Sequence, residues 1–297
     1  MASTRGSVTG GSVVGQRTLG AMLKAERKRV RGRSLKWVVE KTQSAFSVSR
    51  LSRLENGDAK PTRDDVKLLL KLYGVPKDQQ GRFYELLPAE GALPKPHLWY
   101  EAYGSILSAD LYQRIAIEHE AVRSQEYLPL GIPGLLQTRD YAALTQHGAY
   151  LAMGADERAD HTRVRMLRQE RLDGSEPLVL TAYITEATLL LTAGAGPELM
   201  AAQMQRLIDE VDRSNITIRV VPNSAGLKAM YPCGINLLEF GDASSSVVYL
   251  DVVGGSVLRD NERDIQRTLR VFEELDRQAL PQEKTLELLH RKLREIS

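Results

Sequence analysis

SVSRLSRLENG, residues 47–57, is the stretch that decides how the first part of the chain folds. Ser47 can cap the start of a helix through its hydroxyl oxygen, and Gly57 can end that helix because glycine readily adopts a positive φ. Leu51 and Leu54 lie three residues apart and can pack inward on one side of the helix. The serines and arginines around them then share the other side. The stretch therefore predicts a short helix with a buried apolar side and an exposed, positively charged side.

Further short helices are expected on both sides of this stretch. Ser34 and Thr62 each precede an apolar run and can cap a helix. In chain order, the first expected helix begins at Arg17 and the second covers residues 35–42. The third is the helix that begins at about Ser47, and the fourth and fifth cover residues 63–74 and 77–87. Together they make one small all-α, five-helix domain over residues 17–89. Residues 1–16, which are mostly Gly, Ser, Thr and Val without periodicity, are expected to form a flexible leader.

Charge is distributed unevenly along the chain. The first 77 residues hold 17 Lys and Arg against six Asp and Glu, a net charge of +11, whereas the remainder carries −9. A short basic segment suits a polyanion, because neutralising phosphates releases counterions, and an acidic segment would be repelled by nucleic acid. We therefore expect DNA to bind to the N-terminal domain.

The exposed side of the 47–57 helix suits the major groove of double-stranded DNA. Arg53 can form a bidentate pair with O6 and N7 of guanine, and Val48 can pack on a thymine methyl group. The alternative is a small helical bundle whose arginines form only a solvated surface. The charge asymmetry, the pair of capped helices and the sequence of residues 51–57 all agree with the DNA-binding interpretation.

Residues 51–57, LSRLENG, resemble the end of the recognition helix in Xre-type helix-turn-helix regulators, the family that includes phage repressors. The resemblance implies a sequence-specific transcriptional regulator in which Val48, Ser49 and Arg53 contact bases. It also implies phosphate contacts beside them. We expect these from Ser47, Arg50, Asn56 and Lys60, and from Lys36 on the preceding helix.

The second part of the chain is expected to form one larger α+β domain over residues 98–297, joined to the first by a proline-rich linker at 90–97. The apolar runs LVLTAYI, ITIRVV, INLLEF and VVYLDV predict strands of an antiparallel or mixed sheet, with a meander at the end. The alternating sequence of residues 115–121, IAIEHEA, predicts a further extended segment. Helices are expected over 134–147, 155–171, 197–213, 260–277 and 282–295.

Residues 133–138, PGLLQT, with Tyr141 and Ala142 behind them, resemble the start of the uncharacterised domain that follows the helix-turn-helix in actinobacterial WhiJ-like regulators. Further similar positions are Arg163, Arg165 and Arg168, Ile184 to Glu186 with Leu189, and Gln203 with Leu207. Regulators of this group are often encoded beside small partner proteins, so the resemblance implies that a partner of this kind is possible here.

A row of arginines is expected on one face of the 155–171 helix. Arg165 and Arg168 lie three residues apart, and Arg158 lies on an earlier turn. Two interpretations stay open. The row forms a solvated or internally paired surface, or it binds an anionic ligand or an acidic partner.

The sequence shows no pattern for a metal, a cofactor or a catalytic site. The single cysteine, Cys233, has no catalytic motif around it, and Glu118 and Glu120 face away from His119 if this segment is a strand. The five histidines are scattered without metal-binding spacing: His97, His119, His147, His161 and His290. No apolar run reaches the roughly 18 residues of a membrane span. We therefore expect a cytoplasmic protein without enzymatic activity.

Three hypotheses remain for the whole chain. The first is a regulator that forms a homodimer through its C-terminal domain, where it receives a small molecule or a small protein as its signal. The second is an antitoxin-like protein that neutralises a small cognate partner and regulates its own operon. The third, an enzyme with a DNA-binding appendage, lacks any catalytic constellation. The closing helix carries an apolar stripe that can serve a dimer or its own core: Leu286, Leu289, Leu293 and Ile296.

Overall fold

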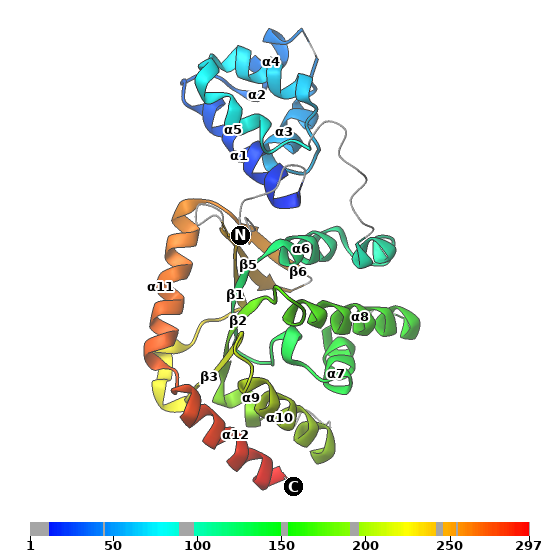
Figure 1. Cartoon of the computed structure of the whole chain (residues 1–297), viewed down its shortest axis with the longest axis vertical. Helices are drawn as coiled ribbons and strands as arrows, with labels where there is room; N and C mark the ends of the chain where they lie inside the picture. Colours follow the sequence, from blue (N-terminus) through cyan, green and yellow to red (C-terminus); the bar gives the residue numbers. More distant parts are fainter. Residues whose placement is uncertain are drawn as a thin grey trace. The chain divides into compact units, whose positions relative to one another are not determined.

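The computed structural model describes residues 12–43, 45–88, 98–149, 154–190, 196–241, 246–253 and 255–296. The chain divides into two compact units, unit 1 (Met1–Leu98) and unit 2 (Trp99–Ser297), and each has a hydrophobic core of its own (Figure 1). The predicted linker at 90–97 and most of the predicted leader lie outside the described residues.

Unit 1 consists of short helices joined by tight turns. They are α1 (Val13–Lys28), α2 (Leu35–Lys41), α3 (Val48–Asn56), α4 (Arg63–Tyr73), the 3-10 helix η1 (Lys77–Gln79) and α5 (Gly81–Tyr84). The hydroxyl oxygens of Ser34 and Ser47 accept backbone N–H groups three residues further on, and Gly57 ends α3 with a φ of 76°. Thr62 and Asp65 form a reciprocal capping box at the start of α4. The predicted ends of α2, α3 and α4 are therefore confirmed.

The first helix begins earlier than the sequence predicted. It starts at Val13 and is capped by the Ser12 side chain, so residues 13–16 belong to the helix and not to a flexible leader. Val14 and Gly15 are buried, and this burial stabilises a turn whose composition alone resembles a leader. The helix predicted over 77–87 is reduced to η1 and α5, since Gly81 disfavours a continuous helix between them.

The inner side of α3 is locked onto α1. The two helices come close together at Gly20, where an added Cβ would lie 2.4 Å from the carbonyl oxygen of Leu54. Arg27, near the end of α1, donates from Nε and Nη2 to the two carboxylate oxygens of Glu55, both at 2.6 Å, and this pair is buried. Leu51 and Leu54 lie in the same core. The opposite side of α3 is left in solvent.

A six-stranded mixed sheet forms the centre of unit 2. Its strands are β1 (Arg123–Leu128), β2 (Val179–Thr185), β3 (Ile216–Val221), β4 (Ile235–Glu239), β5 (Ser246–Val252) and β6 (Gly255–Arg259). They lie in the order β3-β2-β1-β4-β5-β6, with parallel pairing among β1, β2 and β3 and antiparallel pairing elsewhere. The antiparallel meander and the predicted fold class, an all-α domain followed by a mixed α/β domain, are confirmed.

Helices cover both faces of this sheet. They are α6 (Ala109–Glu120), α7 (Arg139–Ala149), α8 (Ala155–Arg168), α9 (Glu186–Leu190), α10 (Pro197–Val211), α11 (Glu262–Gln278) and α12 (Gln282–Ile296), with the 3-10 helices η2 (Trp99–Tyr103), η3 (Gly134–Leu136), η4 (Gln169–Leu172) and η5 (Asn223–Ala229). Figure 1 shows α11 on one side of the sheet and α6, α7 and α8 on the other. α12 packs on α10 and β3, and it buries Leu289 of its apolar stripe there. In the described ranges, no helix is both long and apolar enough to cross a bilayer.

The segment 115–121 is helical up to Glu120 and was not expected to be, so this prediction was wrong. Residues 115–120 form the second half of α6, in which Ile115, Ile117 and Glu118 are all buried. A helix that is buried around much of its circumference loses its one-sided apolar pattern and can resemble an alternating strand. The predicted helix at 134–147 is also divided, into η3 and α7. β1 was missed because its sequence, RSQEYL, is mostly polar.

Candidate nucleic-acid interface and a polar cavity

The exposed side of α3 carries the residues predicted to contact bases. Val48, Ser49 and Arg53 all face solvent, and Val48 leaves 40% of its surface exposed. The guanidinium group of Arg53 forms no hydrogen bond or ion pair with another described residue. Its five N–H donors are therefore available to an acceptor from outside the chain.

The residues expected at phosphates lie around this side of α3. Ser47, Lys36 and Lys60 are exposed. Asn56 is exposed as well, and its side-chain oxygen accepts a hydrogen bond from Lys24 Nζ at 3.0 Å. Lys24 lies on α1, 32 residues from Asn56 in the sequence, so only the packing of α1 against α3 reveals it as a further cation beside the helix.

Arg50 is engaged inside unit 1. Its Nη2 donates to Asp65 Oδ2 at 2.7 Å, and its guanidinium lies 5.1 Å from the centre of the Phe46 ring. The same Asp65 oxygen accepts the backbone N–H of Thr62 in the capping box at the start of α4. Arg50 therefore ties α3 to α4, while its side chain stays partly exposed beside the predicted phosphate contacts.

The turn between α2 and α3 sets how α3 is presented. Thr42 ends α2, and its hydroxyl donates to the backbone oxygen of Val38 at 2.8 Å. Gln43 follows with a φ of 51°, in the left-handed region that few non-glycine residues adopt. Phe46 is buried just before the cap of α3. Phe46 is thus a buried anchor beside the contacts that pack α2 against α3.

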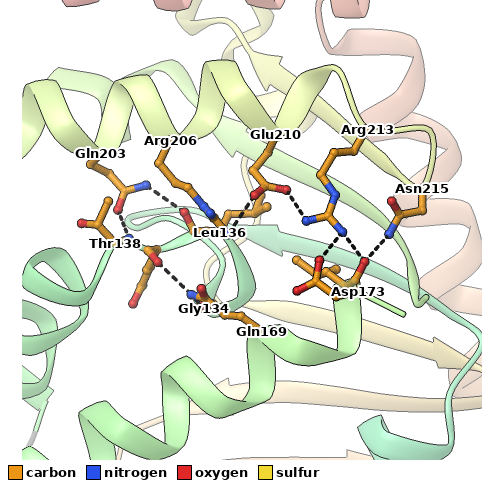
Figure 2. A network of polar contacts seen from close by, with 12 residues as sticks. Gly134, Leu136, Thr138, Gln169, Asp173, Gln203, Arg206, Glu210, Arg213 and Asn215 are labelled. Carbon is orange, nitrogen blue, oxygen red and sulfur yellow. Dashed lines mark hydrogen bonds and ion pairs between the residues drawn. The ribbon is translucent and has the colours of Figure 1, made fainter. Parts of the chain in front are cut away.

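In unit 2, the PGLLQT loop is pinned from two sides, as Figure 2 shows. Gln203 of α10 is fully buried; its Oε1 accepts the N–H of Thr138 at 2.7 Å and its Nε2 donates to Leu136 O at 2.9 Å. Gln169 donates from Nε2 to the backbone oxygens of Gly134 and Gln137, at 3.1 and 2.7 Å. The similar positions at 133–138 and at Gln203 therefore belong to one structural contact.

The same network continues along α10 toward η4 (Figure 2). The buried carboxylate of Glu210 lies between two arginines, Arg206 at 2.8 Å and Arg213 at 3.3 Å. Arg213 also donates to Asp173 Oδ1 at 2.8 Å and to the backbone oxygen of Leu172. These contacts hold α10 against the end of η4. The charged side chains of this network therefore have a structural role, because they pair with one another.

A polar cavity of about 490 Å³ lies beside α6, α8 and the sheet, and two of the arginines of α8 are among its lining residues. Arg168 is paired internally, because its Nε and Nη2 donate to the two oxygens of Glu118 at 2.9 and 2.7 Å. Arg165 lines the cavity, and its Nη1 donates to Gln137 Oε1 at 2.8 Å and to Thr145 Oγ1 at 3.3 Å. Arg158 is half-buried and is not among the lining residues.

Two buried glutamates near this cavity differ in protonation. Burial alone raises the pKa of Glu118, but the charge of Arg168 and its hydrogen bonds outweigh burial and hold the pKa below its usual value. Burial raises the pKa of Glu126, on β1, to about 7, against the opposing charge of Arg114. Glu118 therefore stays ionised near neutral pH, whereas Glu126 titrates there.

The histidines and the cysteine show no clustering in the structure. Burial lowers the pKa of both His119 and His161, so each imidazole favours its neutral form. Cys233 is half-buried, and burial raises the pKa of its thiol. No group of three or more potential metal-ligating side chains occurs in the part of the chain that the structure describes. His97 lies outside that part, as does the side chain of His147.

The sequence analysis missed four charged cavity residues: Asp110, Arg114, Glu126 and Asp251. They come from α6, β1 and β5, and 137 residues separate Arg114 from Asp251. Glu126 carried one usable signal, a glutamate flanked by Tyr127 and Leu128 in a short segment between predicted elements. The sequence of that segment does not show which residues the Glu126 side chain faces.

Comparison with protein families matches two segments of the chain. Residues 18–83 match the model of a helix-turn-helix domain. Residues 112–291, more than half of the chain, match the model of a domain of unknown function, DUF5753. Neither a curated protein nor a solved structure matches the chain.

Proposed function

Because the chain belongs to the DUF5753 family and carries a helix-turn-helix domain ahead of that domain, we propose that it is a sequence-specific transcriptional regulator acting on double-stranded DNA in the cytoplasm. The observation that carries the proposal is the exposed side of α3. There an unpaired Arg53 stands beside Val48 and Ser49 on a helix whose other side is locked into the core. The proposal follows the Xre-type pattern and assigns no enzymatic activity.

In this proposal α3 enters the major groove and α2 crosses the backbone. Arg53 pairs with O6 and N7 of a guanine, and Val48 packs on a thymine methyl group. Lys36, Lys60 and the Ser47 hydroxyl hold phosphates, together with the Lys24 and Asn56 pair. Arg50 serves mainly to hold α3 against α4, because Asp65 already occupies its guanidinium.

We propose further that the regulator acts as a homodimer through unit 2, in the manner of the WhiJ-like regulators that it resembles. One recognition helix reads only a few base pairs, and two-fold symmetric regulators gain affinity from two half-sites. The apolar stripe of α12 is a weak candidate for the dimer interface, because Leu289 is already buried where α12 packs on α10 and β3. Light scattering of the full chain, free and bound to DNA, measures its mass. A protein that is monomeric in both conditions contradicts the homodimer proposal.

The signal would reach unit 2. Its cavity of about 490 Å³ has the size of a small-molecule site, and this favours a small molecule over a small partner protein. Without the cavity, the two kinds of signal would be equally supported. A small protein that co-purifies in equal amounts with the full chain would instead favour the antitoxin-like alternative.

Two alanine variants test the DNA-binding part. Replacing Arg53 by Ala should cost about 1–3 kcal/mol on a selected operator and relax the preference at one base position. Replacing Lys60 by Ala should weaken all sequences alike and reduce the salt dependence of binding by about one counterion. Titration of both variants against the operator and a scrambled duplex measures the contrast. If neither substitution changes affinity, α3 is not the recognition helix.

A further inference from the structure

Acids outnumber cations on one part of the cavity wall in unit 2. The elements α6, β1 and β5 contribute three carboxylates there, which we call the acidic wall: Asp110, Glu126 and Asp251. The same elements contribute one cation, Arg114, whose Nη1 donates to Asp251 Oδ1 at 2.9 Å. Because an ionised group is costly to bury, an excess of acids in a cavity indicates that a positive group is missing from it.

Glu126 is the most deeply buried member of the acidic wall. The residue is only 6% exposed, yet its carboxylate accepts no hydrogen bond from any described residue. Arg114 Nη2 lies 3.9 Å from Glu126 Oε1, which is too far for a hydrogen bond. Since buried polar groups are nearly always hydrogen-bonded, this carboxylate lines the cavity without the donor that its burial requires.

The sheet places a second buried acceptor beside Glu126. Asn236 of β4 is paired directly with Glu126 in the antiparallel register, so the two side chains share one face of the sheet. The Asn236 amide nitrogen donates to Ser124 Oγ at 2.8 Å, but its Oδ1 has no hydrogen-bond partner among the described residues. Two neighbouring acceptors without donors favour a ligand group that carries more than one N–H.

Asp110 extends the acidic wall toward solvent. It lies one turn before Arg114 on α6, it is exposed, and its carboxylate forms no hydrogen bond or ion pair with another described residue. A Cβ added at Gly255 would lie 3.8 Å from Asp110 Oδ2, which places this carboxylate beside the start of β6. An exposed carboxylate on a cavity wall attracts cations from solution.

The other cations of the cavity belong to α8, and the acidic wall does not depend on them. Arg168 is matched by Glu118, to which it donates from Nε and Nη2. Arg165 is held by Gln137 and Thr145 among its contacts. Within the described ranges no three potential metal-ligating side chains come together, which favours an organic cation over a metal ion at the acidic wall.

We propose that the acidic wall binds a small primary amine, whose ammonium group donates hydrogen bonds to the Glu126 carboxylate. An ammonium group carries one positive charge and three N–H donors, which suits a carboxylate and a neighbouring amide oxygen that both lack donors. Asp110 and Asp251 add to the attraction through their charge. This inference rests on the proposed function in one respect only, that the amine would be the signal that the regulator receives. Binding of the amine requires no DNA.

The test is a thermal-unfolding screen of the full chain with short alkylamines, diamines, amino alcohols and arylalkylamines at millimolar concentration. Each amine is measured beside the alcohol of the same shape, which lacks the charge, and beside its trimethylammonium derivative, which keeps the charge but has no N–H. At least one primary amine should raise the Tm, and its two matched compounds should not.

Two variants locate the site. Glu126→Gln, which keeps the side-chain shape, should lose the shift in Tm that the amine causes. The control is Asp209→Asn, at an exposed carboxylate of α10 that accepts a hydrogen bond from Gln205, and this variant should keep the shift.

The pH dependence of binding in the unmodified chain needs no variant that could fail to fold. Burial raises the pKa of Glu126 to about 7, and the carboxyl must be ionised to hold an ammonium group. Affinity for the amine should therefore be level above pH about 7 and fall roughly tenfold per unit below it.

The other charged or titratable side chains around Glu126 do not give this profile. They are Asp110, Arg114 and Glu118 of α6, His161, Arg165 and Arg168 of α8, and Asp251 of β5. The arginines stay charged throughout this range, as does an aliphatic ammonium group. The pKa of Glu118 lies below the range, and burial lowers the pKa of His161, which keeps its imidazole neutral near pH 7.

Any of four outcomes overturns the proposal: no primary amine of the panel raises the Tm, a matched alcohol or trimethylammonium compound binds as well, Glu126→Gln keeps the shift, or the affinity is flat through pH 7. Because the screen contains no DNA, a negative result leaves the DNA-binding proposal intact. Unchanged operator binding by Arg53→Ala would in turn contradict the recognition helix and leave the amine site standing. The two proposals can therefore fail separately.

Discussion

The two units bury a glutamate in opposite ways. In unit 1, Glu55 is gripped by Arg27 through two hydrogen bonds of 2.6 Å. In unit 2, Glu126 is as deeply buried, but its nearest cation stays at 3.9 Å and a cavity opens in front of it. A carboxylate with a matched arginine belongs to the frame of the fold. A buried carboxylate without a hydrogen-bond donor lowers the stability of the fold, which indicates that it has a role other than stabilisation.

This contrast agrees with the two roles that we propose, DNA binding by unit 1 and reception of a signal by unit 2. Unit 1 is closed inside and presents its chemistry on the exposed side of α3. Unit 2 keeps unsatisfied polar groups inside, beside a cavity of about 490 Å³. Proteins often give up stability where a site needs strained or unpaired groups. The units should therefore respond differently when the paired glutamate, the unpaired glutamate or the close contact of α1 with α3 is disturbed.

The largest effect is expected from breaking the buried pair of unit 1. Arg27→Ala leaves Glu55 buried without a cation, which should lower the free energy of unfolding of unit 1 by about 3–5 kcal/mol. Hydrogen exchange of α1 and α3 in the full chain measures it. Replacing both residues by Met removes the stranded charge and should cost much less. A cost below about 1 kcal/mol for Arg27→Ala would show that Glu55 does not depend on this arginine.

The second prediction concerns the unpaired glutamate and pH. The folded chain holds a proton on Glu126 up to about pH 7, whereas an unfolded chain releases it near 4.3. Between these values the folded state binds more protons, so the stability of unit 2 should fall as pH rises, by about 4 kcal/mol in all. Thermal unfolding across this range should show a flatter curve for Glu126→Gln. The control is Asp209→Asn, at the exposed carboxylate of α10 that accepts a hydrogen bond from Gln205, and its curve should follow that of the unmodified chain. A Glu126→Gln curve parallel to the curve of the unmodified chain would contradict the prediction.

The smallest effect is expected at the contact between α1 and α3. Gly20→Ala places a methyl group 2.4 Å from Leu54 O, and relief of this overlap should cost about 1–3 kcal/mol. Gly81→Ala is the matched control, because nothing lies within 4 Å of its added carbon and alanine favours a helix there. Unfolding of the two variants is compared under one condition. Equal stability of the two would mean that α1 shifts away freely, and the close crossing would then matter little.

Local chemistry made the helix ends of unit 1 readable from the sequence. The caps at Ser34, Ser47 and Thr62 act on backbone groups only three residues away, so a short window contains donor and acceptor together. The first helix shows the limit, because its turn at 13–16 depends on burial against the rest of the unit. In the same way, the helix of residues 115–120 resembles a strand until its surroundings are known.

The candidate sites divide along the same line. The exposed row of Val48, Ser49 and Arg53 lies within six residues, and helical periodicity brings it to one side. The cavity required several elements to meet, among them α6, α8, β1 and β5. Arg114 reaches Asp251 across 137 positions, and Glu126 faces Asn236 only through the pairing of β1 with β4.

The sequence by itself determined the ends of α2, α3 and α4, the charge division between the two parts, the strand candidates and the exposed side of α3. Each of these depends on residues within a few positions of one another, or on composition. The tertiary structure alone decided that Arg50 is bound by Asp65, that Glu118 neutralises Arg168, and that Glu126 is left without a donor. The physical reason is that a buried charge is stabilised by whichever group lies within about 3 Å in space, and chain folding chooses that group from distant parts of the sequence.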